Sequence, residues 1–144
     1  MVLGVPPVAT YAATVLFNIR EQINEGKTPD DLEMEFTFTG SADEKWFYAI
    51  SAAIDAHSGE ISMIAKGLLN ESNYSSMNNL ALELSKKIRE LTSVLNRMYE
   101  RCSPEVFSGH VRPYLNGWLN DSEFPEGLCY KLSDGRCEYL KLAG

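Results

Sequence analysis

The chain has 144 residues, enough for one domain that buries roughly two-thirds of the surface of its unfolded form. Hydrophobic residues make up 44% and charged residues 23%, a balance typical of a globular protein and not of a disordered one. The formal net charge of −7 argues against a phosphate-binding surface, so we expect no nucleic-acid partner.

The densest basic cluster, at residues 86–89, is interleaved with glutamates, and its spacing predicts Glu83–Lys87 and Lys86–Glu90 pairs on a solvated helix face. Three cysteines without ligand spacing indicate neither a disulfide framework nor a zinc site. The apolar start is too short to span a membrane and lacks the basic region of a signal peptide. We therefore expect a cytoplasmic protein with reduced thiols and no membrane contact.

In the first part of the chain, apolar residues at helical spacing predict a helix from Val8 to Ile23, after two prolines and before Gly26. The stretch 26–40 contains Pro, Asp and two Gly residues around an alternating segment at 33–39. Alternation is compatible with a short extended segment or with an ordered loop. We expect the loop.

Ser41, followed three residues later by Glu44, is the pattern of a capping box and predicts a helix start. We expect that helix to end near Gly59 and a short helix to follow over 61–68. Apolar residues at near-heptad spacing then predict a long helix over 76–101.

Ser103 and Pro104 predict a final helix that contains the stretch FSGHVRPYLNGW. Pro113 removes one helical N–H, and its ring presses on the carbonyl of Gly109, so we expect this helix to bend. The residues after Asn120 predict an irregular tail. The fold class is therefore all-α, with about five helices.

The bend bears on the one cation of this stretch, Arg112. Residues 107 and 112 lie about 140° apart on an undistorted helix, so they share a pocket only where the helix is distorted. Such a distortion would let Arg112 point into a cavity lined by Phe107, Tyr114 and Leu115, where a guanidinium suits a carboxylate. The alternative is an ion pair with Asp121 or Glu123 over apolar surface.

Four stretches are LGVPPVATYAATVLFN, FTFTGSADEKWFYAISAAIDA, RMYERCSPEVFSGHVRPYLNGW and PEGLCY. In order and spacing they resemble consecutive blocks of the indoleamine 2,3-dioxygenase family, and RPYLNGW is the most specific of them. The resemblance covers nearly the whole chain. It implies that residues 1–144 are part of a larger all-α haem domain.

The resemblance also implies an activity. Members of this family are haem-dependent, cytoplasmic dioxygenases of tryptophan catabolism, which open the indole ring of L-tryptophan or a related indoleamine with dioxygen. The product is N-formylkynurenine, in the kynurenine pathway. The iron of haem b carries dioxygen, while the protein orients the indole and excludes water. We expect no general base.

By position in the family, Arg112 is expected to bind the substrate carboxylate and Phe107 to pack against the indole. The family positions that line the distal pocket are matched by Tyr11, Phe47, Ser51 and Leu115. Ordinary structural roles remain open for these four residues. Phe47 and Ser51, four residues apart on a helix, also suit a core face, with the Ser51 hydroxyl bonded to its own helix.

The chain departs from the family at Ser108, where family members have a second aromatic residue, and this loosens the wall beside the substrate. Family chains have a smaller N-terminal domain before this region and continue past Gly144 to a histidine that ligates the iron. Neither His57 nor His110 matches that histidine. We therefore expect a distal half-domain with no metal ligand, little hold on haem and no turnover alone.

A second hypothesis is a non-catalytic helical interaction module derived from the same scaffold. A half-domain leaves apolar faces uncovered, and such faces favour association with a partner.

Overall fold

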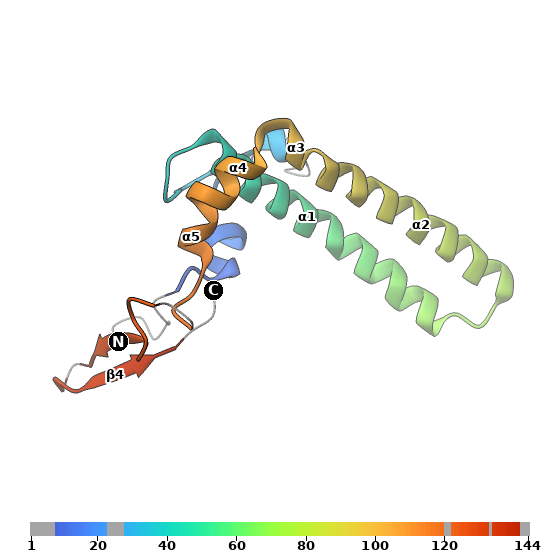
Figure 1. Ribbon diagram of the computed structural model, residues 1–144. Helices are drawn as coiled ribbons and strands as arrows, with labels where there is room; N and C mark the ends of the chain where they lie inside the picture. The colour runs from blue at the N-terminus through green and yellow to red at the C-terminus, as the bar shows by residue number, and fades with distance from the viewer. Residues whose placement is uncertain (1–7, 23–27, 120–121, 133, 142–144) are drawn as a thin grey trace.

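The computed structural model describes residues 8–22, 28–119, 122–132 and 134–141. Two long antiparallel helices form an extended hairpin, and short helical turns and two small sheets lie away from its tip (Figure 1). This arrangement confirms the predicted all-α class. The helical segments are η1 (Ala12–Leu16), η2 (Pro29–Asp31), α1 (Ala42–Asn70), α2 (Tyr74–Asn96), α3 (Met98–Arg101), α4 (Pro104–Val106), η3 (Phe107–Val111) and α5 (Arg112–Leu115). The strands are β1 (Ile19–Gln22), β2 (Leu32–Met34), β3 (Leu128–Lys131) and β4 (Cys137–Leu140).

The predicted helix over 8–23 is wrong beyond its first turns, and Ile23 lies outside the described residues. After the π-helical turn η1, the chain extends into β1, which pairs antiparallel with β2. The loop expected over 26–40 is therefore wrong at β2. Asn18 explains the change: its buried side chain donates to Thr14 O at 2.9 Å and Phe36 O at 3.0 Å, and it accepts from Phe36 N.

The start of α1 is confirmed as predicted, because the Ser41 hydroxyl accepts from Glu44 N at 3.2 Å. The Glu44 carboxylate does not complete a capping box. It accepts instead from the backbone of Phe38 and Thr39, at 2.8 and 2.7 Å, and from the Thr39 hydroxyl at 2.6 Å. Glu44 is fully buried, so this carboxylate fastens the preceding segment to the helix.

The helix end expected at Gly59 is wrong, since α1 continues to Asn70. A glycine inside a helix costs about 1 kcal/mol relative to alanine, and packing of α1 along α2 outweighs that cost.

Gly59→Ala is expected to raise the free energy of unfolding by about 0.5–1 kcal/mol, because a Cβ at this position meets nothing within 4 Å and restricts the unfolded chain. Urea unfolding followed by circular dichroism measures the change. The matched variant is Gly127→Ala, which we expect to destabilise the protein: Gly127 has φ +91°, and its Cβ would lie 2.5 Å from Leu140 O. Equal effects of the two substitutions would contradict this account.

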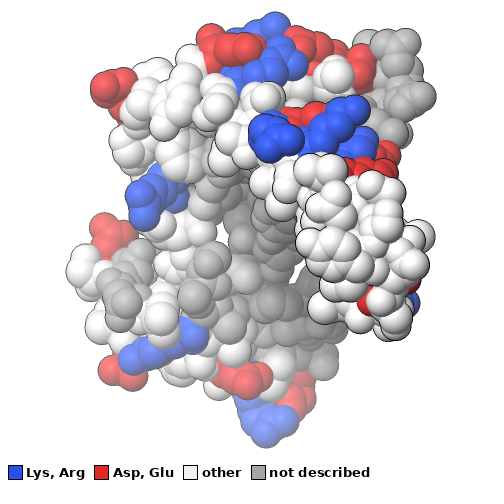
Figure 2. Space-filling view, turned by 90° about the vertical axis from the view of Figure 1, so that its right-hand side faces the viewer, with Lys and Arg blue, Asp and Glu red and all other residues white. Residues whose placement is uncertain are grey.

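The long helix predicted over 76–101 is confirmed with one interruption at Arg97, between α2 and α3. Lys86 pairs with Glu90 as predicted, at 3.9 Å, whereas Lys87 pairs with Glu90 and, across the hairpin, with Glu60 at 2.8 Å. Figure 2 shows Lys and Arg side chains lying beside Asp and Glu side chains, with wide uncharged areas between them. That mixed surface agrees with the expected solvated helix face.

The core lies at the base of the hairpin. One cluster packs Val15 and Met34 against Tyr48 on α1, and the other packs Trp46 and Ile50 against Cys102. The indole N–H of Trp46 donates to the carbonyl of Arg97 at 2.8 Å. At the interruption between α2 and α3, the Arg97 carbonyl thus accepts from the buried indole as well as from Glu100 N, at 3.0 Å.

The tail is not irregular as expected: β3 and β4 form an antiparallel hairpin that pairs Leu128 with Leu140. The sequence signal for this hairpin is a short alternating segment with turn residues around it. It was missed because the segment contains few apolar residues. Within the described ranges, no helix has the length and apolar character needed to cross a membrane.

Candidate functional site

The stretch that holds Arg112 is bent, as predicted, and the bend is the π-helical turn η3. The backbone N–H of Arg112 donates to Phe107 O, five residues back. Pro113 has no N–H to bond to Gly109, so the regular α-helical pattern is interrupted here. Such turns occur in helices next to functional sites.

Phe107 at the start of η3 lies against Phe47 of α1, with ring centroids 4.6 Å apart and planes at 40°. These two rings form one wall of a cavity of about 380 Å³. The cavity is open to one side and mainly apolar. Its other lining residues are Leu95, Asn96, Met98, Tyr99, Cys102 and Pro104.

The wall is held in place by hydrogen bonds from both of its elements. The backbone N–H of Ser103 donates to the Asp43 carboxylate at 2.8 Å, which fixes the start of α4 against the start of α1. The Ser108 hydroxyl donates to Pro104 O at 2.6 Å. Ser108 therefore bonds to its own helix and does not extend the aromatic wall. Burial, followed by the nearby Asp43 charge, raises the pKa of the Cys102 thiol.

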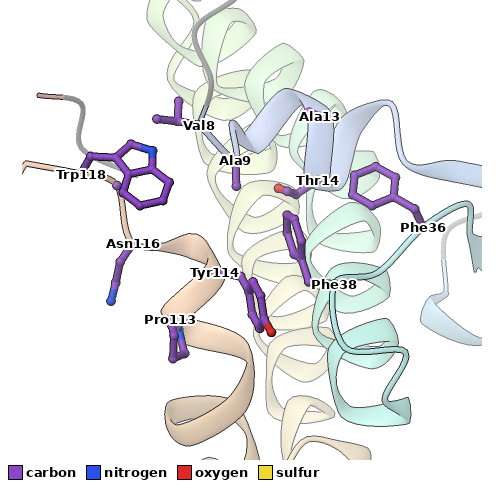
Figure 3. A pocket seen from close by; sticks show the side chains of 11 residues that line it. Val8, Ala9, Ala13, Thr14, Phe36, Phe38, Pro113, Tyr114, Asn116 and Trp118 are labelled. Carbon is purple, nitrogen blue, oxygen red and sulfur yellow. The ribbon is translucent and has the colours of Figure 1, made fainter. Parts of the chain in front are cut away.

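A larger hollow of about 670 Å³ lies between the N-terminal segment and α5 (Figure 3). Phe38 and Tyr114 stack across it with centroids 5.3 Å apart and planes at 3°. Thr14 and Trp118 also line it. Phe107 at the start of the bend thus lines one cavity, and residues 113, 114 and 116–118 after it line another.

Tyr11 lines neither cavity. Its hydroxyl donates to the Asp55 carboxylate of α1 at 2.5 Å, while the side chain is half exposed. Burial, the hydrogen bond to Asp55 and its negative charge together raise the pKa of Tyr11 to about 12. The phenol therefore fastens the N-terminal segment to α1.

Asp55→Asn is expected to lower the pKa of Tyr11 from about 12 toward the ordinary value near 10. Because the pKa of the folded form is the higher one, the contact stabilises the protein below pH 10 and is lost as the pH rises through 12. A tyrosinate absorbance titration, with Tyr11→Phe subtracted to isolate this residue, measures the shift. If the Tyr11 titration curves of the unsubstituted protein and of Asp55→Asn superimpose, the hydrogen bond to Asp55 does not raise the pKa of Tyr11.

Two other predicted site residues make structural contacts. The Ser51 hydroxyl donates to Phe47 O at 2.9 Å, the bond to its own helix that we left open. Leu115 packs against the core cluster around Val15 and Tyr48.

The structure does not place Arg112 as expected. Its side chain is exposed, it lines neither cavity described above, and the described residues offer it no ion pair or hydrogen bond. The cavity expected from Phe107, Tyr114 and Leu115 is not formed, because these residues face three different surroundings. The cause is Val111: it is fully buried, so the inward position of this turn is taken and Arg112 follows about 100° around the helix.

Sequence reasoning missed most of the smaller cavity's lining. Met98 was only the last apolar position named for the predicted long helix, and Cys102 was only one of three cysteines without ligand spacing. The interruption at Arg97 and the extended backbone at Cys102 turn these side chains toward Phe107. The signal that could have revealed them is Cys102 directly before the Ser103–Pro104 helix start, a pattern that ends one helix and begins another.

Comparison with known proteins identifies the scaffold. The family model described as indoleamine 2,3-dioxygenase matches residues 1–144. The chain belongs to the indoleamine 2,3-dioxygenase family. It is 33% identical to indoleamine 2,3-dioxygenase acdA of Aspergillus candidus, over 99% of this chain and 38% of that protein. It is 35% identical to indoleamine 2,3-dioxygenase of Saccharomyces cerevisiae, over 90% of this chain and 31% of that protein.

A third relative is 6-hydroxytryptophan 2,3-dioxygenase fscD of Fusarium equiseti, 31% identical over 99% of this chain and 36% of that protein. The chain therefore spans about a third of the length of these relatives. The region matched to the family contains the residues that line both cavities and the bent helix.

Proposed function

We propose that this chain forms the substrate-facing wall of a haem-dependent dioxygenase that opens the indole ring of L-tryptophan to N-formylkynurenine. Family membership supports dioxygenase chemistry, and a relative named for 6-hydroxytryptophan supports a tryptophan-like substrate. The observation that carries the proposal is the Phe47–Phe107 pair above an apolar cavity that opens to one side.

The apolar lining of the smaller cavity is suited to packing against one face of a haem group. Its lining is aromatic and aliphatic, with Tyr99 exposed at the edge, and such surfaces suit a flat apolar macrocycle. The lining contains no imidazole: His57 lies on α1 and His110 on η3, and neither borders the cavity. The described residues thus fit as the wall that packs against haem, and they do not supply an axial histidine from this cavity.

When bound, ferrous haem supplies the activation of dioxygen. The residues of this chain then do three things. Phe107 and Phe47 pack against the indole and exclude water, which strengthens every electrostatic contact nearby. The Ser103–Asp43 bond keeps the two rings at a fixed separation. Arg112 lines neither cavity, and we infer its role from its position in the family: its guanidinium, left without a partner among the described residues, binds the substrate carboxylate.

Phe107→Ala, in the full-length protein that carries this chain, is expected to lower turnover of L-tryptophan at least tenfold, because the indole loses the ring that orients it. The matched control is Phe17→Ala, which removes an exposed ring that lines neither cavity, and it should leave turnover unchanged. Formation of N-formylkynurenine is followed by absorbance. Unchanged turnover in Phe107→Ala, or no product from the parent protein, would refute the proposal.

A second candidate function is a non-catalytic interaction module. The α1–α2 hairpin favours it, since Met63, Leu69, Tyr74 and Leu82 are all more than half exposed. Mixing the full-length protein that carries this chain with haem and dithionite separates the two functions. A Soret band that shifts on adding carbon monoxide supports the haem-binding wall, whereas a folded chain with no such band favours the module.

A further inference from the structure

The β3–β4 hairpin carries two of the three cysteines, and the mechanism proposed above uses neither. Cys129 pairs with Tyr139, and Lys131 pairs with Cys137. Side chains two apart on a strand share a face. Cys129 and Cys137 therefore lie on one face of the hairpin, at diagonal positions, and both are exposed.

The hydrogen-bond pattern brings this diagonal pair close. Leu132 N–H donates to Arg136 O at 2.8 Å at the turn, and bonded and non-bonded pairs alternate along an antiparallel ladder. The 131/137 and 129/139 pairs therefore occupy non-hydrogen-bonded sites, where side chains approach most closely.

The turn that joins the strands is built to hold this arrangement. Gly135 N–H donates to Leu132 O at 3.0 Å, and Gly135 has φ +86°, which suits glycine. The Arg136 side chain donates to Asp134 at 2.7 Å, and its backbone N–H donates to the same carboxylate at 3.0 Å. The two thiols are therefore presented by a closed turn.

Geometry decides what the pair can hold. A disulfide needs Cα atoms about 4.4–6.8 Å apart, whereas diagonal neighbours lie about 7–8 Å apart. An atom bridging two sulfurs through bonds of about 2.3 Å spans up to about 4.6 Å between them, which fits the wider spacing. Structural zinc needs four ligands, and the described residues contain no group of three or more candidate ligands.

We propose that Cys129 and Cys137 form a two-coordinate site for a soft, thiophilic cation of the copper(I) class. Thiolates select such ions over harder divalent metals. Binding exchanges two S–H protons for one cation, giving a bis-thiolate complex of charge −1 and two released protons, with no change in oxidation state. The ammonium of Lys131, on the same face, offsets the negative charge of that complex.

Copper(I) titration of the reduced 144-residue chain, without oxygen and against a competing chelator, tests the site. We expect one ion bound per chain. Cys129→Ser and Cys137→Ser should each weaken binding by about 100-fold, since each removes the second arm of a chelate. Cys102→Ala removes the third, buried thiol and should leave the affinity unchanged.

Native mass spectrometry gives the stoichiometry of the complex, and circular dichroism verifies that each variant is folded. Phenylarsine oxide gives an independent measurement, because its arsenic bonds two thiols and releases water. We expect the parent chain and Cys102→Ala to bind it as monomers. Affinity retained by the folded Cys129→Ser and Cys137→Ser variants, or an ion held only between two chains, would overturn the proposal.

Discussion

Glu44→Ala is expected to lower the free energy of unfolding by about 3–5 kcal/mol. The carboxylate is fully buried and accepts from Phe38 N, Thr39 N and the Thr39 hydroxyl. Its removal leaves two backbone N–H groups without acceptors and opens a cavity at the start of α1. Urea unfolding of the chain, monitored by circular dichroism, measures the loss.

The matched control is Glu33→Ala on β2, whose carboxylate forms only an exposed pair with Arg20 at 3.5 Å. Such a pair contributes at most about 1 kcal/mol. Glu44→Gln keeps the shape and one acceptor, so it should fall between the two. If Glu44→Ala and Glu33→Ala destabilise the protein equally, the buried carboxylate does not hold the 36–39 segment in place.

Arg112→Ala, in the full-length protein, is expected to raise the KM for L-tryptophan by about 10–100-fold, the loss of a charge-assisted hydrogen bond worth about 1.5–3 kcal/mol. An indole substrate without a carboxylate should be used as well as by the parent protein. The comparison isolates the carboxylate contact, because a general loss of folding lowers the use of both substrates.

Two variants sharpen that test. Arg112→Lys keeps the charge but loses the planar fork, so it should recover only part of the affinity. Arg89→Ala removes an exposed cation of α2 that lines neither cavity, and it should change neither KM. Equal losses for both substrates in Arg112→Ala would show that this guanidinium does not bind the carboxylate.

The sequence predicted those parts of the fold that local chemistry determines. Ser41 begins α1 and Ser103 begins α4 because each hydroxyl accepts a backbone N–H three residues on. The end expected at Gly59 was wrong because contacts along α2 outweigh a local preference. The first helix was overextended because Asn18 redirects the chain through bonds to residue 36, which no local pattern contains.

The candidate site divides in the same way. Phe47 and Phe107 were predicted to serve one pocket, and the structure places them in contact with each other in one wall of a cavity. The distortion at Pro113 was predicted correctly, but the direction of Arg112 was not. The direction of Arg112 depends on which residue of this turn packs into the core, and that residue is Val111. Hydrophobic periodicity indicates which residues are candidates for an inward position, and packing decides which of them is buried.

The π turn η3 has a genetic consequence. Such a turn is an α-turn with one surplus residue. Loss of a single codon within 108–111 would remove the π turn and rotate everything after it by about 100°. Tyr114 would leave Phe38, and the larger hollow would lose a wall although no lining side chain had been replaced. The number of residues in this turn therefore constrains the scaffold, as the identities of its residues do.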